Sequence, residues 1–98
     1  MRTRSVLDQF IGREIKQSGT ELYFDRSTAL EIIDCCAKAR IPILGLDGAR
    51  IDERGHQELL EWSLNLSASP HDYDASRRHL HQPQFAGLAW LLTLDEPP

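Results

Sequence analysis

Apolar side chains recur every three or four residues in two segments near the start of the chain. In the first segment, this spacing predicts a helix over residues 5–18. Its apolar stripe consists of Val6, Leu7, Phe10, Ile11 and Ile15. In the second segment, residues 25–40, Thr28 and Glu31 have the spacing of a capping box. The apolar face of this second predicted helix consists of Ala29, Leu30, Ile32, Ile33, Cys36 and Ala37.

Four shorter segments have the residue types and flanking turn signals of β-strands. They lie at residues 21–24, 41–46, 49–52 and 60–66. The second of these is a continuous apolar run, in which Pro42 and Gly45 argue against a helix. Asp47-Gly48 then has the sequence of a two-residue hairpin turn. The last of the four alternates apolar and polar residues, which is the period of a half-buried strand. Leu59, Trp62 and Leu66 also fit a helical stripe, so a helical first turn in the stretch 56–66 stays open as an alternative.

The end of the chain again has helical spacing. Pro83 precedes the apolar residues Phe85, Leu88, Ala89, Leu91 and Leu92, and proline is favourable in the first turn of a helix. We therefore predict a helix over residues 83–92. Residues 67–82 are polar with few apolar anchors, and the pattern leaves open whether residues 72–81 form a helical turn of their own.

Together these elements predict a single α/β (α+β) domain over residues 1–98, with helices packed against a small mixed β-sheet of about four strands. Because a helix connects residues 21–24 to residues 41–46, we expect these two strands to be parallel neighbours. A chain of this length can bury a core without disulfides or metals. The predicted shared core consists of Leu30, Ile33, Ile43, Leu44, Leu64 and Leu88.

Composition narrows the class of protein. The net charge is −4, which argues against a nucleic-acid partner. No apolar run is long enough to cross a membrane, and the first residues lack the apolar stretch of a signal peptide. Cys35 and Cys36 are adjacent and have no other cysteine to pair with, so we expect reduced thiols in a reducing compartment. The expected location is the cytoplasm.

The sequence contains no pattern typical of a catalytic, cofactor-binding or metal site. The four histidines, His56, His71, His79 and His81, lack metal-ligand spacing, and we expect them to be exposed to solvent. There is no G-x-S-x-G nucleophile elbow and no glycine-rich phosphate loop. We therefore predict a protein that is not an enzyme and has no catalytic residue, metal or cofactor.

One segment has an uneven charge that fits a partner-binding surface. Residues 44–66 contain five acidic and two basic side chains, a net charge of −3. A solvated face explains such a segment, and so does a docking surface for a basic partner. Trp62 fits either the core or an interface. The candidate partner-binding residues are Asp47, Asp52, Glu53, Glu58, Glu61 and Trp62.

Residues 29–65 resemble the small cytoplasmic immunity proteins of bacterial polymorphic-toxin systems. The resemblance rests on Ile41-Pro42-Ile43-Leu44-Gly45, on Asp47-Gly48 and Ile51-Asp52, and on Trp62, and it covers about a third of the chain. It implies a protein that binds one cognate toxin and neutralises it without chemistry of its own. The acidic character suits a basic nuclease toxin.

Two other classes stay open. One is an intracellular adaptor or regulatory subunit that uses the same surface on another protein. The other is a small enzyme with a site built from turn residues such as Asp52, Glu53 and His56. The oligomeric state does not follow from the sequence.

Overall fold

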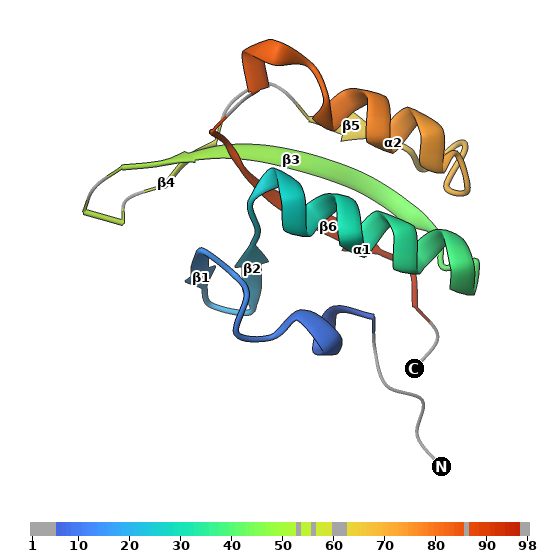
Figure 1. Cartoon of the computed structure of the whole chain (residues 1–98), viewed down its shortest axis with the longest axis horizontal. Helices are drawn as coiled ribbons and strands as arrows, with labels where there is room; N and C mark the ends of the chain where they lie inside the picture. The colour runs from blue at the N-terminus through green and yellow to red at the C-terminus, as the bar shows by residue number, and fades with distance from the viewer. Residues whose placement is uncertain (1–5, 53, 56, 60–62, 86, 97–98) are drawn as a thin grey trace.

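A computed structural model describes residues 6–52, 54–55, 57–59, 63–85 and 87–96. The chain folds into helices packed against β-strands, which confirms the predicted α/β class (Figure 1). The elements, with η for a 3₁₀ helix, are η1 (Leu7–Phe10), β1 (Lys16–Ser18), β2 (Glu21–Tyr23), α1 (Arg26–Ala39), β3 (Ile43–Ile51), β4 (Gln57–Leu59), β5 (Leu64–Asn65), α2 (Tyr73–Leu80), η2 (Pro83–Phe85) and β6 (Ala89–Leu94). No helix among these described residues is both long and apolar enough to cross a bilayer.

Helix α1 is the helix predicted over residues 25–40. Its N-cap is Asp25, whose carboxylate Oδ1 accepts a hydrogen bond from the Thr28 backbone N–H at 2.8 Å. The predicted capping pair of Thr28 and Glu31 is therefore wrong, because Thr28 already lies within the first turn. The helix ends at Arg40, which adopts the left-handed conformation (φ 59°) and lets the Ile41 N–H donate to the Cys36 carbonyl.

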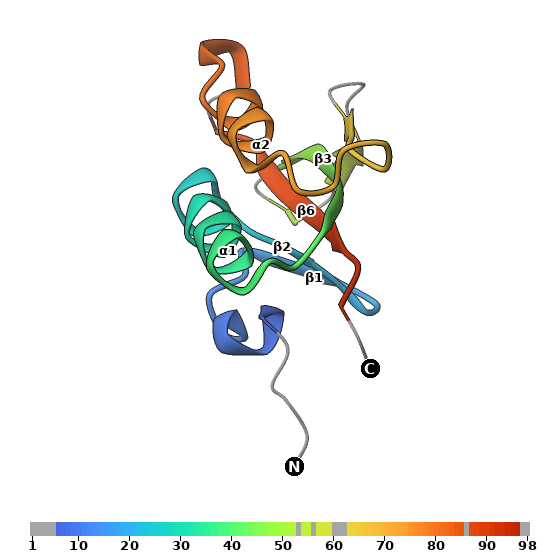
Figure 2. The same cartoon turned by 90° about the vertical axis from the view of Figure 1, so that its right-hand side faces the viewer.

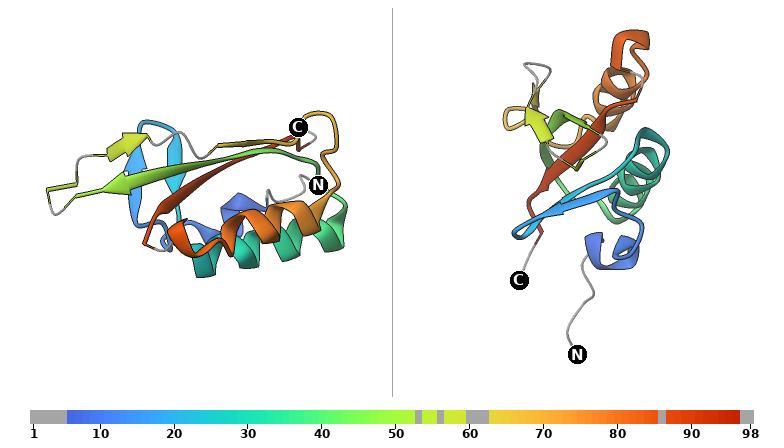
Figure 3. Two further views of the ribbon diagram at one scale, coloured as in Figure 1. Left: turned by 90° about the horizontal axis from the view of Figure 1, so that it is seen from above. Right: turned by 90° about the vertical axis from the view of Figure 1, so that its left-hand side faces the viewer.

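Strand β3 is the centre of a four-stranded sheet. β6 pairs with it along one edge, and β4 and β5 follow one another along the other edge. Figure 2 and the left panel of Figure 3 show α1 and α2 side by side on one face of these strands. The predicted arrangement of about four strands covered by helices is confirmed.

A second, two-stranded sheet consists of β1 and β2. It joins the larger sheet at one point, where the backbones of Phe24 and Trp90 exchange hydrogen bonds of 2.9 and 2.7 Å. All strand pairs among the described residues are antiparallel. The expected parallel pairing of residues 21–24 with 41–46 is wrong, because β6 occupies the position between β2 and β3.

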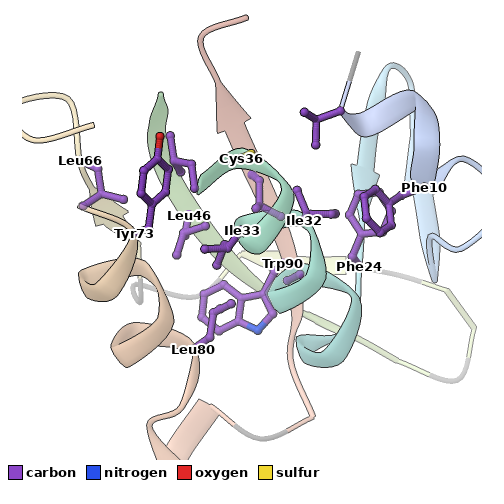
Figure 4. Packing of buried hydrophobic residues seen from close by; sticks show 14 of the residues in the cluster. Phe10, Phe24, Ile32, Ile33, Cys36, Leu46, Leu66, Tyr73, Leu80 and Trp90 are labelled. Carbon is purple, nitrogen blue, oxygen red and sulfur yellow. The ribbon is translucent and has the colours of Figure 1, made fainter. Parts of the chain in front are cut away.

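The core lies between the helices and the sheet, and Trp90 of β6 is at its centre (Figure 4). Among the predicted core residues, Ile33, Ile43 and Leu88 are buried, and Leu30 and Leu64 pack against them while partly buried. Leu44 is outside the cluster, because it directly follows the buried Ile43 and successive side chains of a strand point to opposite faces.

The helix predicted over residues 5–18 is wrong. One 3₁₀ turn, η1, buries Phe10, and Gly12 then takes a positive φ of 98°, which ends any helical path. β1 follows. Ile11 and Ile15, which were to complete the apolar stripe, are 63% and 51% exposed.

The helix predicted over residues 83–92 is also wrong. Pro83 begins only the short turn η2, and residues 89–94 form strand β6. The helix in this part of the chain is instead α2, in the polar segment that the pattern left unassigned. Asp72 caps it by accepting from the Ala75 N–H at 3.0 Å, and its buried face consists of Tyr73, Ser76 and Leu80.

The hairpin turn predicted at Asp47-Gly48 is wrong as well. β3 runs through both residues, which pair with Leu91 and Trp90 of β6. The predicted strand over residues 49–52 is therefore the continuation of β3 and not its partner. Of the strand predicted over residues 60–66, the described part contains β5, while residues 60–62 lie outside the described residues.

Candidate functional site

The sequence placed the candidate site on what the structure shows to be a hairpin arm. We use this name for the part of β3 from Asp47 onward, the turn that follows, and β4. The arm reaches past the ends of both helices (Figure 1 and Figure 3, left). At its turn, Asp52 Oδ1 accepts from the Arg54 N–H at 2.9 Å, and the Gly55 N–H donates to the Asp52 carbonyl at 3.0 Å. Gly55 has a φ of 81°, which explains why glycine stands there.

The arm separates the predicted acidic residues. Asp47 is half-buried at the base, and Asp52 is exposed at the turn. Five residues of strand place them about 17 Å apart. Glu58 lies in β4, opposite Arg50 in the register. Glu53, Glu61 and Trp62, the other three predicted residues, lie outside the described residues.

Basic residues reduce the negative charge of the arm. Arg50 and Arg54 are exposed on it. From β1, Lys16 reaches the turn, where its Nζ would lie 3.5 Å from a Cβ placed on Gly55. The net charge of −3 predicted for residues 44–66 is therefore offset locally by a cation from elsewhere in the chain.

Asp47 takes part in a separate polar site at the base of the arm. Its Oδ1 accepts from the Ser63 hydroxyl at 2.5 Å. Both residues line a pocket of about 330 Å³ that also includes Asn65 and Thr93. Such an arrangement holds the β5 segment against β3 and orients the Asp47 carboxylate.

Side chains that could bind a metal or act in catalysis do not gather at one place among the described residues. Among the described residues, no group of three or more histidine, cysteine or acidic side chains is placed to bind a metal. Glu53 and His56 of the alternative enzyme site lie outside the described residues. Cys35 and Cys36 are free thiols, and burial raises the pKa of Cys36 to about 12.

The expectation that the histidines are exposed holds for His71 and His81 but is wrong for His79. His79 is half-buried on α2, with its ring 4.9 Å from that of Phe85 and 5.4 Å from that of Trp90. The turn η2 brings Phe85 back over α2, and this contact depends on tertiary structure that spacing alone does not show. His56 lies outside the described residues.

Sequence reasoning missed a groove along the outward face of α1. We call it the α1 groove; it has a volume of about 570 Å³ and is lined by Ile15, Asp25, Arg26, Ser27, Leu30, Glu31, Asp34, Gly87 and Leu88. One signal was available, since Glu31 and Asp34 have the three-residue spacing that places side chains on one helix face. The contribution of Ile15 was not predictable, because this residue was assigned to a helix.

Ion pairs organise the rim of the α1 groove. Arg13 binds Glu31 through its guanidinium, and this hydrogen bond lowers the pKa of the Glu31 carboxyl and raises that of Arg13. Arg77 of α2 donates to Asp34 at 2.9 Å and to Asp74 at 2.9 Å. The hydrogen bond to Asp34 raises the pKa of the Arg77 guanidinium. These pairs fix α1 against its neighbours on both sides.

No family model matches the chain, and neither the curated proteins nor the solved structures include a significant match to it.

Proposed function

We propose that the chain is an immunity protein that binds a cognate bacterial toxin in the cytoplasm and neutralises it by protein–protein contact. The hairpin arm is the proposed contact surface, with Asp52 at its turn and Glu58 on β4. The protein acts by covering the toxin, and its own side chains supply no chemical step. A basic toxin, such as a nuclease domain, fits the acidic residues of the arm.

The observation that carries this proposal is the projection of the arm from the helical layers. Three residue pairs join β3 to β4 in the arm: Ala49–Leu59, Arg50–Glu58 and Ile51–Gln57. This ladder fixes the backbone of the arm before a partner arrives, which lowers the entropic cost of binding. The exposed turn then presents side chains without disturbing the core.

The order of elements supports the resemblance to immunity proteins in part. A helix, a strand that contains Ile43-Leu44-Gly45, a turn and a second strand follow one another from α1 to β4. The turn lies at residues 52–55, later than the Asp47-Gly48 position that the resemblance implies.

Protection of cells tests the proposal. The chain is co-expressed in bacteria with the toxin domain encoded next to its gene, and survival is compared with that of cells that produce the toxin alone. We expect the chain to restore growth and to form a complex with the purified toxin. If it neither protects nor binds, the proposal is wrong; if it captures a cellular enzyme that is not a toxin, the adaptor class replaces it.

Charge variants test the arm itself. Asp52→Asn keeps the oxygen that accepts from Arg54 but removes the charge, and it is combined with Glu53→Gln. We expect association with the toxin to slow several-fold in low salt and the difference to vanish near 1 M salt, where charges are screened within about 3 Å. Asp95→Asn, exposed and outside the arm, is the matched control. Unchanged association of the arm variant would exclude the arm as an electrostatic contact.

A further inference from the structure

The pocket at the base of the hairpin arm lies on the face of the sheet that points away from the helices. We call it the base pocket; it is lined by Leu44, Gly45, Asp47, Ser63, Leu64, Asn65 and Thr93. Leu46 and Gly48 face the core, so Asp47 between them points to the opposite face. Gly45 lies opposite Thr93 of β6 and has no side chain to fill the space between them. A hollow therefore lies beside the Asp47 carboxylate.

This carboxylate is held in place and keeps one oxygen available. Its Oδ1 accepts from the Ser63 hydroxyl at 2.5 Å, whereas Oδ2 accepts no hydrogen bond from the described residues. Asp47 is half-buried, so water screens its charge less than that of a fully exposed carboxylate. A cation that donates to Oδ2 would therefore form a charge-assisted hydrogen bond with a group that is already oriented.

The side chains next to Asp47 are neutral. Leu91 of β6 lies opposite it in the register, and Ser63 approaches it from the β5 side. Arg50, the basic residue of β3, is three positions further along the strand and so points to the other face. Asp47 forms no salt bridge with the described residues. Its charge is therefore not offset within the described part of the chain.

The size and the acceptor groups of the base pocket favour one ammonium group. Its volume of about 330 Å³ is at the small end of ligand pockets, which span roughly 300–1,000 Å³. Besides the open oxygen of Asp47, the lining contains the exposed Thr93 hydroxyl and the half-buried, apolar Leu44 and Leu64. Lysine matches this lining, because it joins an apolar four-carbon stem to three N–H donors. Arginine binds best to both oxygens of a carboxylate, and Ser63 already occupies Oδ1.

We propose that the base pocket receives a lysine side chain of a partner protein. The ammonium donates to Oδ2 of Asp47, and the stem of the lysine lies against Leu44 and Leu64. The pocket is distinct from the exposed turn of the arm, and its binding of lysine can be measured without a toxin. The inference therefore does not depend on the proposed function.

Nuclear magnetic resonance tests the inference directly. The ¹⁵N-labelled chain is titrated at constant ionic strength with the peptide acetyl-Gly-Lys-Gly-amide, and we expect saturable shifts at the amides of Gly45, Asn65 and Thr93. A control peptide carries Nε-acetyllysine, which keeps the stem but removes the charge, and we expect it not to bind. A second control carries arginine and should bind several-fold more weakly. Absence of saturable shifts at these amides, or binding of either control as tight as that of the lysine peptide, would overturn the proposal.

A pair of variants locates the binding. Asp47→Asn keeps an oxygen that can accept from Ser63 but removes the charge, so it should weaken binding of the lysine peptide several-fold in low salt. Asp8→Asn should leave binding unchanged, since Asp8 is exposed on η1 and does not line the base pocket. The amide shifts of residues remote from the pocket show that both variants are folded. Equal binding of the lysine peptide to the two variants would exclude the base pocket as the site.

Discussion

Gly48 shows how one residue can serve a purpose that its sequence context does not reveal. It lies within β3 opposite Trp90, and its φ is not positive. A Cβ at this position would lie 3.2 Å from Leu88 Cδ1 and 3.2 Å from Trp90 Cζ3. Glycine is therefore present to make room for the indole, although Asp47-Gly48 is also the strongest short signal for a hairpin turn.

We expect Gly48→Ala to lower the free energy of unfolding by about 1–3 kcal/mol, because the new methyl group overpacks a filled core. Denaturant titration followed by tryptophan fluorescence measures this loss.

A double-mutant cycle identifies the contact. Trp90→Phe removes Cζ3 and Cη2, together with a buried indole N–H that has no acceptor among the described residues. In the Trp90→Phe background, followed by circular dichroism, Gly48→Ala should cost clearly less than in the wild type. An equal cost in both backgrounds would show that the indole is not what limits the space at Gly48.

Asp25 is the second residue for which we expect a measurable contribution to the stability of the fold. Its hydrogen bond from the Thr28 N–H lowers the pKa of the carboxyl below its ordinary value. We expect Asp25→Ala to cost about 1 kcal/mol at pH 7, as for other N-cap replacements, and Asp25→Asn to cost less because the amide oxygen still accepts. Thermal unfolding of the three proteins provides the comparison.

The pH dependence of this contribution has a definite sign. Because the pKa is lower in the folded state, the charged cap stabilises the fold above the unfolded value of about 3.9. The contribution is lost as the pH falls through the folded-state pKa. The stability gap between wild type and Asp25→Ala should therefore be full at pH 7 and shrink below about pH 4. A gap that stays constant to pH 2 would mean that the charge does not contribute.

At the scale of elements, the spacing of apolar residues predicts the right type of element where one face of a segment is buried. It gives the wrong type where both faces are buried. α1 has one apolar face and was predicted within one residue at each end. β6 buries Trp90 and Leu92 against the helices and Ala89 against Tyr23 on the other face. Such a strand reads as a continuous apolar run, which spacing alone cannot distinguish from a buried helix.

The helix prediction for the first segment is wrong for a different reason. The stripe that suggested a helix over residues 5–18 includes Ile11 and Ile15, and both are largely exposed. Only η1 forms, because Gly12 and the pairing of β1 with β2 take the chain elsewhere. α2 was missed in turn because its short buried face carries Ser76, a polar residue that the apolar pattern does not count.

The sheet should be uneven in local stability. β3 has partners along both edges, whereas β1 and β2 are three residues each and pair mainly with one another. We expect the β3 amides to exchange with deuterium orders of magnitude more slowly than those of β1, because β3 opens only with the whole core. Hydrogen exchange read by nuclear magnetic resonance measures both strands in one sample. Similar rates would show that the two sheets open together.

For the whole molecule, local sequence patterns predict the class of fold, whereas contacts between distant parts of the chain determine where the candidate sites lie. The candidate acidic residues were chosen from a continuous segment, but β-structure spreads such a segment over about 17 Å from Asp47 to Asp52. The α1 groove instead gathers Ile15, Leu30 and Leu88 from three distant parts of the chain. Only the folded arrangement of β1, α1 and the residues before β6 places them together.

The position of β6 has a consequence for the order in which the protein can fold during synthesis. β6 is translated after β2, α1 and β3, and it lies against all three: it pairs with β3, bridges Phe24 after β2, and places Trp90 under α1. Until it emerges from the ribosome, these elements share an unfilled apolar space and an open strand edge. Such an intermediate exposes surfaces that bind chaperones or other nascent chains. The native sheet therefore closes only when this late segment arrives.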